Sequence, residues 1–312
     1  MIAPHCLIPG LNFGDHPAEY LQAEAEQLGV QGMRQAVSDA LLTQFQNVVQ
    51  RLKLRSEYQI MSNIIDTSGN GTSGKESLEG KKAGPQFRVL DSTCGFSLSV
   101  AASSVENGGY GLWVSGKAPL GGIVALYPGV AYPVQFHRRI PGYPSIALSN
   151  RHLISRYDKV IVDAKPWGQR NIEISFKAES PSNRAEEAMF QLQQNNPFAV
   201  AQWCNHPPPG ILPNVVTATL DWVPEYSKGS LLQTREYFPV IQYGASHEQV
   251  KGSVQLPMIT QDVIVSGLAL IAIRDIEDEE VFLNYRLNPN AINSLPDWYH
   301  PVDKEEDIRR WS

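Results

Sequence analysis

The sequence is short of the features that mark several large protein classes. Its three cysteines, Cys6, Cys94 and Cys204, lie far apart and form no CxxC pair, so no sequence-local zinc site is expected. The net charge of -6 argues against a general nucleic-acid binder, because phosphate binding relies on clustered Lys and Arg. No apolar run approaches the length of about 18 residues that a transmembrane helix needs.

The N-terminus lacks a charged segment followed by an apolar block, which is the pattern of a secretory signal peptide. Together with the odd number of cysteines, this favours an intracellular, reducing compartment, either nucleus or cytoplasm. The compact basic group is His137-Arg138-Arg139, with Arg151, His152 and Arg156 following, and a solvated loop is the simpler interpretation of it. We therefore expect neither a direct nucleic-acid partner nor a membrane partner.

The chain of 312 residues is 42 % hydrophobic, which is ordinary for a folded protein. Residues 1–65 are predicted to form a helical extension. Residues 18–28 have a helix-forming composition, and from residue 33 to 53 apolar residues recur at steps of three or four. These are Val37, Leu41, Phe45, Val48 and Leu52. Such a face packs either on the main domain or on a partner, and the main domain is favoured.

A change of pattern follows the extension. Residues 66–86 are rich in Gly, Ser and charge and are predicted to be a flexible linker. Over residues 87–287, short β-rich runs alternate with Gly and Pro, which predicts a mainly β (α+β) domain of short strands in small sheets. The expected strands are Phe96–Ala101, Gly111–Val114, Ile123–Tyr127, Val160–Asp163, Val215–Trp222 and Val263–Ile273. Insertions interrupt the rhythm near 168–198 and 224–260, and a polar tail with aromatic anchors spans 288–312.

Four segments could carry chemistry, although each has a plain structural interpretation when taken alone. Gly109-Tyr110-Gly111 is a hairpin turn or a place where a ligand approaches the backbone. Tyr127-Pro128-Gly129 closes a strand, and Asn205-His206 before a proline run either caps a loop or binds a ligand. The apolar stretch that begins at Leu268 ends on Tyr285, whose hydroxyl needs a partner if it is buried.

Taken in order, these segments resemble a SET domain, the fold of protein-lysine methyltransferases. The resemblance covers residues 95–287. It rests on the GxG turn, the Tyr-x-Gly strand end, an Asp-Ala strand end, the Asn-His motif with a trailing Pro-Asn, and a terminal Arg-Asp-Ile, acidic pair and Tyr. In this sequence they stand as Gly109-Tyr110-Gly111, Tyr127-Pro128-Gly129, Asp163-Ala164, Asn205-His206 with Pro213-Asn214, and Arg274-Asp275-Ile276 with Glu279-Glu280 and Tyr285.

The resemblance implies an S-adenosylmethionine-dependent methyltransferase that acts on an exposed lysine of a protein substrate. Tyr285 would orient the amine and the methyl group. The residues implied to hold the cofactor are Gly109, Tyr110, Gly111, Leu112, Trp113, Asn205 and His206. Tyr127 would line the lysine channel, or else pack in the core, and Trp298 and Tyr299 of the tail are expected to fold over that channel. No zinc or other metal site is expected.

The sequence also departs from the family pattern. Prolines follow Asn205-His206 where Ser-Cys is usual, Val130 replaces the usual Glu, and the cysteine-rich zinc segment that follows many SET domains is absent. Two alternatives therefore stay open: a SET-fold binding or scaffold module without turnover, and an unrelated β-rich binding domain with chance matches. Arg274 and Asp275 are expected to fix the sheet edge through an ion pair, and Glu279 and Glu280 either to contact the Asn205 loop or to stay in solvent.

Overall fold

The computed structural model describes residues 29–30, 32–54, 87–89, 94–146, 150–165, 196–223, 235–244, 264–288 and 295–312. The helix predicted at 18–28, the linker at 66–86 and most of the two insertions lie outside the described residues. Among the residues that the structure describes, none of the helices has the length and hydropathy that a membrane span requires.

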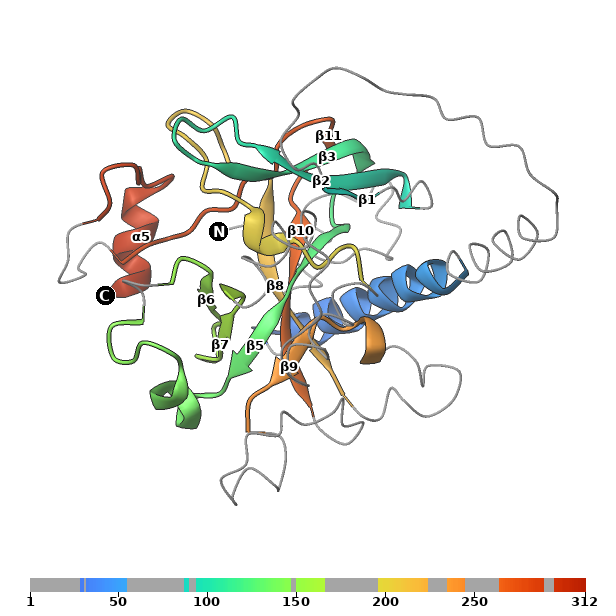
Figure 1. Ribbon diagram of the computed structural model, residues 1–312, viewed down its shortest axis with the longest axis horizontal. Helices are drawn as coiled ribbons and strands as arrows, with labels where there is room; N and C mark the ends of the chain where they lie inside the picture. The colour runs from blue at the N-terminus through green and yellow to red at the C-terminus, as the bar shows by residue number, and fades with distance from the viewer. Residues whose placement is uncertain are drawn as a thin grey trace, which may run out of the picture.

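Three small sheets build the domain (Figure 1). The first has the order β1-β2-β3-β11, the second β4-β10-β8 and the third β6-β7-β5-β9. Neighbouring strands are antiparallel except for β5 and β9. The strand bounds are β1 Phe87–Val89, β2 Phe96–Ala102, β3 Tyr110–Ala118, β4 Ile123–Tyr127, β5 Gly129–Tyr132, β6 Leu153–Ser155, β7 Ile161–Asp163, β8 Val215–Trp222, β9 Val240–Gln242, β10 Val265–Ala272 and β11 Ile276–Glu277. The fold is mainly β, as predicted from the sequence.

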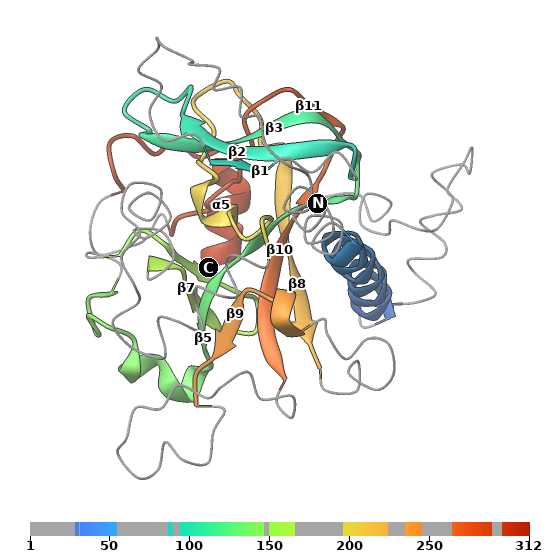
Figure 2. The ribbon, with the colours of Figure 1, turned by 45° about the vertical axis from the view of Figure 1, so that its right-hand side comes forward.

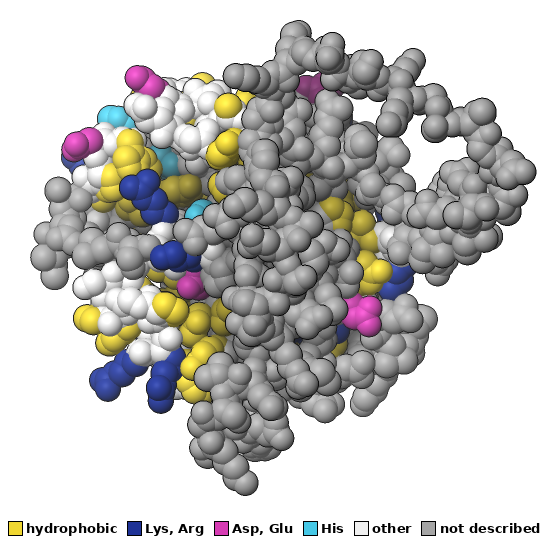
Figure 3. All heavy atoms as spheres, in the orientation of Figure 1, with side chains coloured by type: hydrophobic (Ala, Val, Ile, Leu, Met, Phe, Trp, Pro, Cys, Tyr) yellow, Lys and Arg dark blue, Asp and Glu magenta, His cyan; other side chains and the backbone are white. Residues whose placement is uncertain are grey.

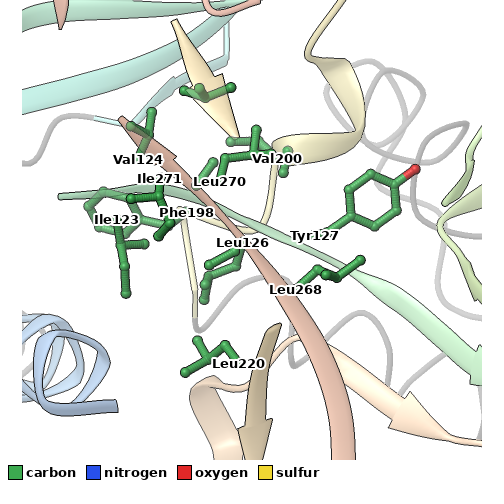
Figure 4. Close-up of a cluster of buried hydrophobic side chains, with 14 of the residues drawn as sticks. Ile123, Val124, Leu126, Tyr127, Phe198, Val200, Leu220, Leu268, Leu270 and Ile271 are labelled. Atoms are coloured by element: carbon green, nitrogen blue, oxygen red, sulfur yellow. The ribbon is translucent and has the colours of Figure 1, made fainter. Parts of the chain in front are cut away.

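The central strand β10 explains the long apolar run in the second half of the chain. It lies between β4 and β8, and seven of its eight residues are buried. A strand covered on both faces reads as a continuous apolar run rather than an alternating one. Its register places Leu268 opposite Tyr127 on one side and Thr219 on the other. Side chains of β4, β8 and β10 meet in the hydrophobic cluster of Figure 4.

The helix over residues 32–54 packs beside β8 and β10 (Figure 2). Its apolar face is buried, and Phe45 meets Phe238 edge-on with ring centroids 5.5 Å apart. Gln44 adds polar contacts: its side chain donates to the carbonyl of Gly121 and accepts from the backbone N–H of Ile123. The apolar face of the helix therefore packs on the main domain, which was the alternative that the sequence favoured.

Short helices lie between the strands and after the last of them. They are the 3-10 helices η3 Val134–Arg139, η4 Ala201–Trp203 and η6 Arg235–Tyr237, and the C-terminal α-helix α5 Lys304–Trp311. The carboxylate of Asp303 caps α5 by accepting from the backbone N–H of Glu306 at 2.9 Å. The sequence predicted anchors in this tail but not the helix.

Candidate functional site

The site lies where residues 279–285 run between β3 and residues 205–215. On one side, Val281 N donates to the carbonyl of Leu112 at 2.7 Å. On the other side, Leu283 N donates to the carbonyl of Asn205 at 2.9 Å. Three segments that are distant in the sequence are thereby fixed side by side.

Asn214 holds this crossing together. It is fully buried, its amide donates to the carbonyl of Glu280 at 2.8 Å, and its side-chain oxygen accepts from Phe282 N at 2.7 Å. Buried polar groups are stable only when they are paired, so this asparagine specifies the local backbone path. Sequence analysis placed Asn214 in a motif but gave it no role.

The buried carboxylate of Glu280 lies at the centre of the glycine turn. It accepts from the hydroxyl of Ser103 at 2.6 Å and from both the backbone N–H and the hydroxyl of Ser104, at 2.7 and 2.6 Å. The amide of Asn205 approaches it at 3.4 Å. Of the two possibilities that the sequence left open, Glu280 therefore contacts the Asn205 loop.

The neighbouring acidic and basic residues form two separate ion pairs. Arg274 pairs with Glu279, whereas Asp275 pairs with Lys117 of β3 at 2.6 Å. The hydrogen bond to Lys117 and the backbone N–H of Leu120 lower the pKa of Asp275. Lys117 and Leu120 thus tie the turn before β11 to β3 and the loop after it. Arg274 and Asp275 form ion pairs with other residues rather than with each other.

The two outer glycines of the predicted turn have different physical roles. Gly109 has φ +66°, a left-handed conformation that favours glycine, and the space beside it is open. A Cβ at Gly111 would collide with the carboxylate of Glu280. The group that closely approaches the backbone at Gly111 is therefore the carboxylate of Glu280.

Asn205 ties this turn together through its side-chain amide. Its amide donates to the carbonyl of Tyr110 at 2.9 Å and to the hydroxyl of Ser103 at 3.0 Å. Among the residues with described positions, its side-chain oxygen has no recorded donor. This half-buried oxygen can accept from a ligand's N–H group.

The remaining residues implied for the cofactor pocket differ in exposure. The side chain of Leu112 is fully buried in the core, and its carbonyl accepts a hydrogen bond from Val281 N. Trp113 is half-buried and donates to the carbonyl of Ala102 at 3.2 Å. Leu112 therefore lies behind the turn rather than on its open side.

Tyr285 combines an accessible ring with an enclosed hydroxyl. The residue is 38 % exposed, yet its hydroxyl donates to the carbonyl of Cys204 at 2.9 Å. Burial of that hydroxyl raises the pKa of Tyr285, so the phenol stays protonated in neutral solution. The hydroxyl thus has the partner that a buried tyrosine requires.

The imidazole of His206 supports Tyr285 from behind. Its Nδ1 accepts from Tyr285 N at 3.3 Å, and its Nε2 lies 2.8 Å from the carbonyl of His300. These contacts assign the neutral tautomer with the proton on Nε2. Burial lowers the pKa of His206, which favours the same neutral form. Both ring nitrogens are therefore occupied by the protein itself.

The C-terminal tail packs against this pair. The ring of Tyr299 lies 4.6 Å from that of His206, and the ring of Trp298 stands edge-on to Tyr285 at 6.2 Å. The hydroxyl of Tyr299 donates to Asp307 and accepts from Leu287 N, both at 3.1 Å, and burial raises its pKa to about 12. The tail aromatics thus meet the residues that the sequence placed in the site.

Tyr127 closes β4 beside the same site. It is buried, and Figure 4 shows its hydroxyl pointing out of the hydrophobic cluster that surrounds its ring. Burial is the main cause that raises the pKa of Tyr127. Electrostatic interactions with Tyr285, Asp163 and Cys204 raise it further. Its ring therefore packs in the core, while its hydroxyl points away from the cluster.

Gln202 and Trp203 were missed by the sequence analysis. Gln202 is 8 % exposed, and neither its side-chain nitrogen nor its oxygen has a partner in the described structure. The indole N–H of Trp203 is buried and has no partner among the described residues, and its ring lies 6.1 Å from that of Tyr110. Buried polar atoms without partners indicate water or a ligand. The sequence signal that could have indicated Gln202 is a glutamine within an apolar run just before Asn205.

Within the segments that the structure describes, no three His, Cys, Asp or Glu side chains are grouped as metal ligands would be.

Comparison with known proteins adds a distant likeness. No family model matches the chain. It is 27 % identical over 207 residues to SET domain-containing protein 9 of Homo sapiens, and 26 % identical over 208 residues to that of Pongo abelii. Each match covers 63 % of this chain, and they cover 60 % and 66 % of the relatives. The chain resembles a SET-domain protein. Its small sheets agree with a SET-like fold, and it spans less than two thirds of these relatives.

Proposed function

We propose that the chain is an S-adenosylmethionine-dependent methyltransferase whose acceptor is a lysine side chain of a protein. The observation that carries this proposal is the placement of residues 279–285 between β3 and residues 205–215. It brings the turn at Gly109, the side-chain oxygen of Asn205 and the enclosed hydroxyl of Tyr285 to one place, in a chain that resembles SET-domain proteins.

The unpaired polar atoms fit the amino-acid end of S-adenosylmethionine. An α-carboxylate needs donors, which the Gln202 amide and the Trp203 indole provide, and an α-ammonium needs acceptors, such as the Asn205 oxygen. When bound, the cofactor supplies an electrophilic methyl group on a sulfonium. The contacts of His206 and Leu112 are already filled, so they support the site rather than bind directly.

Tyr285 would orient the reacting groups. Its hydroxyl proton is committed to Cys204, which leaves the oxygen lone pairs as acceptors for polarised C–H groups. Because the pKa of both Tyr285 and Tyr127 is raised, both remain neutral phenols at neutral pH and neither accepts the proton of a lysine ammonium. They would position a lysine that has lost its proton elsewhere.

A SET-fold binding module without turnover is the second candidate. It is supported by the carboxylate of Glu280, which fills the space at Gly111, and by the prolines that follow His206. Either feature is compatible with a site maintained for structure.

Two measurements separate these functions. Calorimetry with S-adenosylmethionine should show binding for both SET-type candidates, and absence of binding would remove them. Radiolabelled methyl transfer to cell extract should then fall at least about a hundredfold in Tyr285→Phe. The unfolding free energy should fall by only about 1 kcal/mol, because one hydrogen bond is lost. Tyr237→Phe, which loses a hydroxyl elsewhere, is the control, and undiminished transfer by Tyr285→Phe would remove Tyr285 from its role.

A further inference from the structure

A group of exposed cations, here called the basic face, lies beside the third sheet. Its members are Arg34, Arg138, Arg139 and Lys159. They come from three places in the sequence: the N-terminal helix, the last turn of η3 and the turn between β6 and β7. Figure 3 shows Lys and Arg side chains beside hydrophobic ones over the lower left of the molecule, where η3 lies.

Specific contacts join these elements. His137 of η3 places its Nε2 2.9 Å from the carbonyl of Lys159. Arg34 holds its guanidinium 4.6 Å from the ring centroid of Tyr157, two residues before Lys159. The cations therefore converge through folding, which the sequence order alone does not show.

Asp158, the acidic residue next to Lys159, does not neutralise the basic face. Asp158 directs both carboxylate oxygens at the buried guanidinium of Arg156, at 3.1 and 2.7 Å. Within the described part of the chain, no ion pair is recorded for the four cations. A local positive surface thus persists on a chain whose net charge is -6.

Exposed apolar side chains lie among the charges. Tyr143 is 49 % exposed and Tyr157 60 %, and Val134 at the start of η3 is also exposed. Arginine mixed with tyrosine is typical of protein-binding surfaces. A nucleic acid fits less well, because the chain's overall negative charge repels a long polyanion and four cations form no extended stripe.

The basic face is connected to the candidate site by two strands. β5 follows Tyr127 and Pro128 and leads to η3. β7 runs from the Lys159 turn to Asp163, which pairs with Val130, three residues after Tyr127. The four steps along the chain from Lys159 to Asp163 correspond to about 13 Å when the chain is extended. A peptide bound with a lysine near Tyr127 would reach the cations after roughly four to six residues.

We propose that the basic face binds acidic residues of the protein substrate, placed roughly four to six residues from the acceptor lysine. The inference rests on the proposed function and adds the substrate class: a lysine in an acidic sequence context.

Fluorescence anisotropy on the full chain tests this without cofactor, so its outcome does not depend on methyl transfer. The probes are a labelled peptide with one lysine followed, about five residues on, by a glutamate run, and the same peptide with serines in place of the glutamates. The acidic peptide should bind more tightly, and the difference should shrink as salt is raised. Arg138→Glu combined with Arg139→Glu should weaken its binding about tenfold.

The matched control is Arg51→Glu combined with Lys304→Glu, which makes the same change in net charge away from the basic face. It should leave binding of the acidic peptide close to that of the parent chain. Equal binding of the two peptides, or equal weakening by the two double variants, would overturn the proposal. The proposal would also be overturned if a labelled RNA or DNA oligonucleotide bound more tightly than the acidic peptide and lost this binding in the Arg138→Glu, Arg139→Glu variant.

Discussion

At the residue scale, the site depends on buried polar groups whose partners lie far away in the sequence. Asn214, Glu280 and His206 each hydrogen-bond to segments more than sixty residues away. The residue types were visible in the sequence, and the need for partners followed from burial. Which partners they found, including the serines around Glu280, required the fold.

The depressed pKa of His206 predicts a pH-dependent stability. Its ordinary value is 6.5, and burial lowers it in the folded chain. The unfolded chain therefore binds a proton below about pH 6.5 while the folded chain resists it, so the free energy of unfolding falls as pH drops through this range. His152 is shifted in the same direction, also by burial first.

Urea unfolding at about pH 7.5 and about pH 5.5 measures this change. His206→Gln keeps a donor toward the carbonyl of His300 and should lose less stability on acidification than the parent chain. An identical loss in His206→Gln would mean that His206 is not the titrating group.

At the scale of elements, the apolar pattern predicted strands well and the tail poorly. β4 and β8 have the predicted bounds, because each is an apolar run between turn residues. The start of β10 falls within its predicted range. Helix α5 is mostly charged, and its anchoring depends on Asp307 reaching Tyr299, a contact that no periodicity reveals.

The N-terminal helix is predicted to be part of the folding unit. Phe45→Ala removes a buried ring that meets Phe238 and should lower the free energy of unfolding by about 3–5 kcal/mol. Leu54→Ala, at an exposed position of the same helix, should change it by less than about 0.5 kcal/mol. Denaturant unfolding compares the two, and a small effect of Phe45→Ala would mean that the helix is not integral.

At the scale of the whole molecule, the C-terminal tail completes one side of the site. It covers His206 through Tyr299 and the carbonyl of His300 and meets Tyr285 through Trp298. The sequence suggested such a return, because aromatic residues in a polar tail usually pack on something. The contacts place the tail beside the site, where it would act as a lid.

Deletion of residues 288–312 tests the lid. The shortened chain should keep its sheets, melt at a lower temperature because the contacts of Tyr299 are lost, and show strongly reduced methyl transfer. Circular dichroism and the radiolabel assay measure these effects. Arg309→Ala, an exposed change within α5, is the control. Unchanged methyl transfer in a folded, shortened chain would reject the lid.

The sequence by itself determined the mainly β class, the amphipathic helix and the order of the motifs, because apolar periodicity and turn residues are local properties. It also indicated Tyr285 and Asn205 as candidates. Only the tertiary structure decided that Glu280 fills the space at Gly111, that Gln202 is buried with no partner among the described residues, and that cations from three elements share one face. These features arise where distant segments meet, and contacts of that kind leave no periodic signal in the chain.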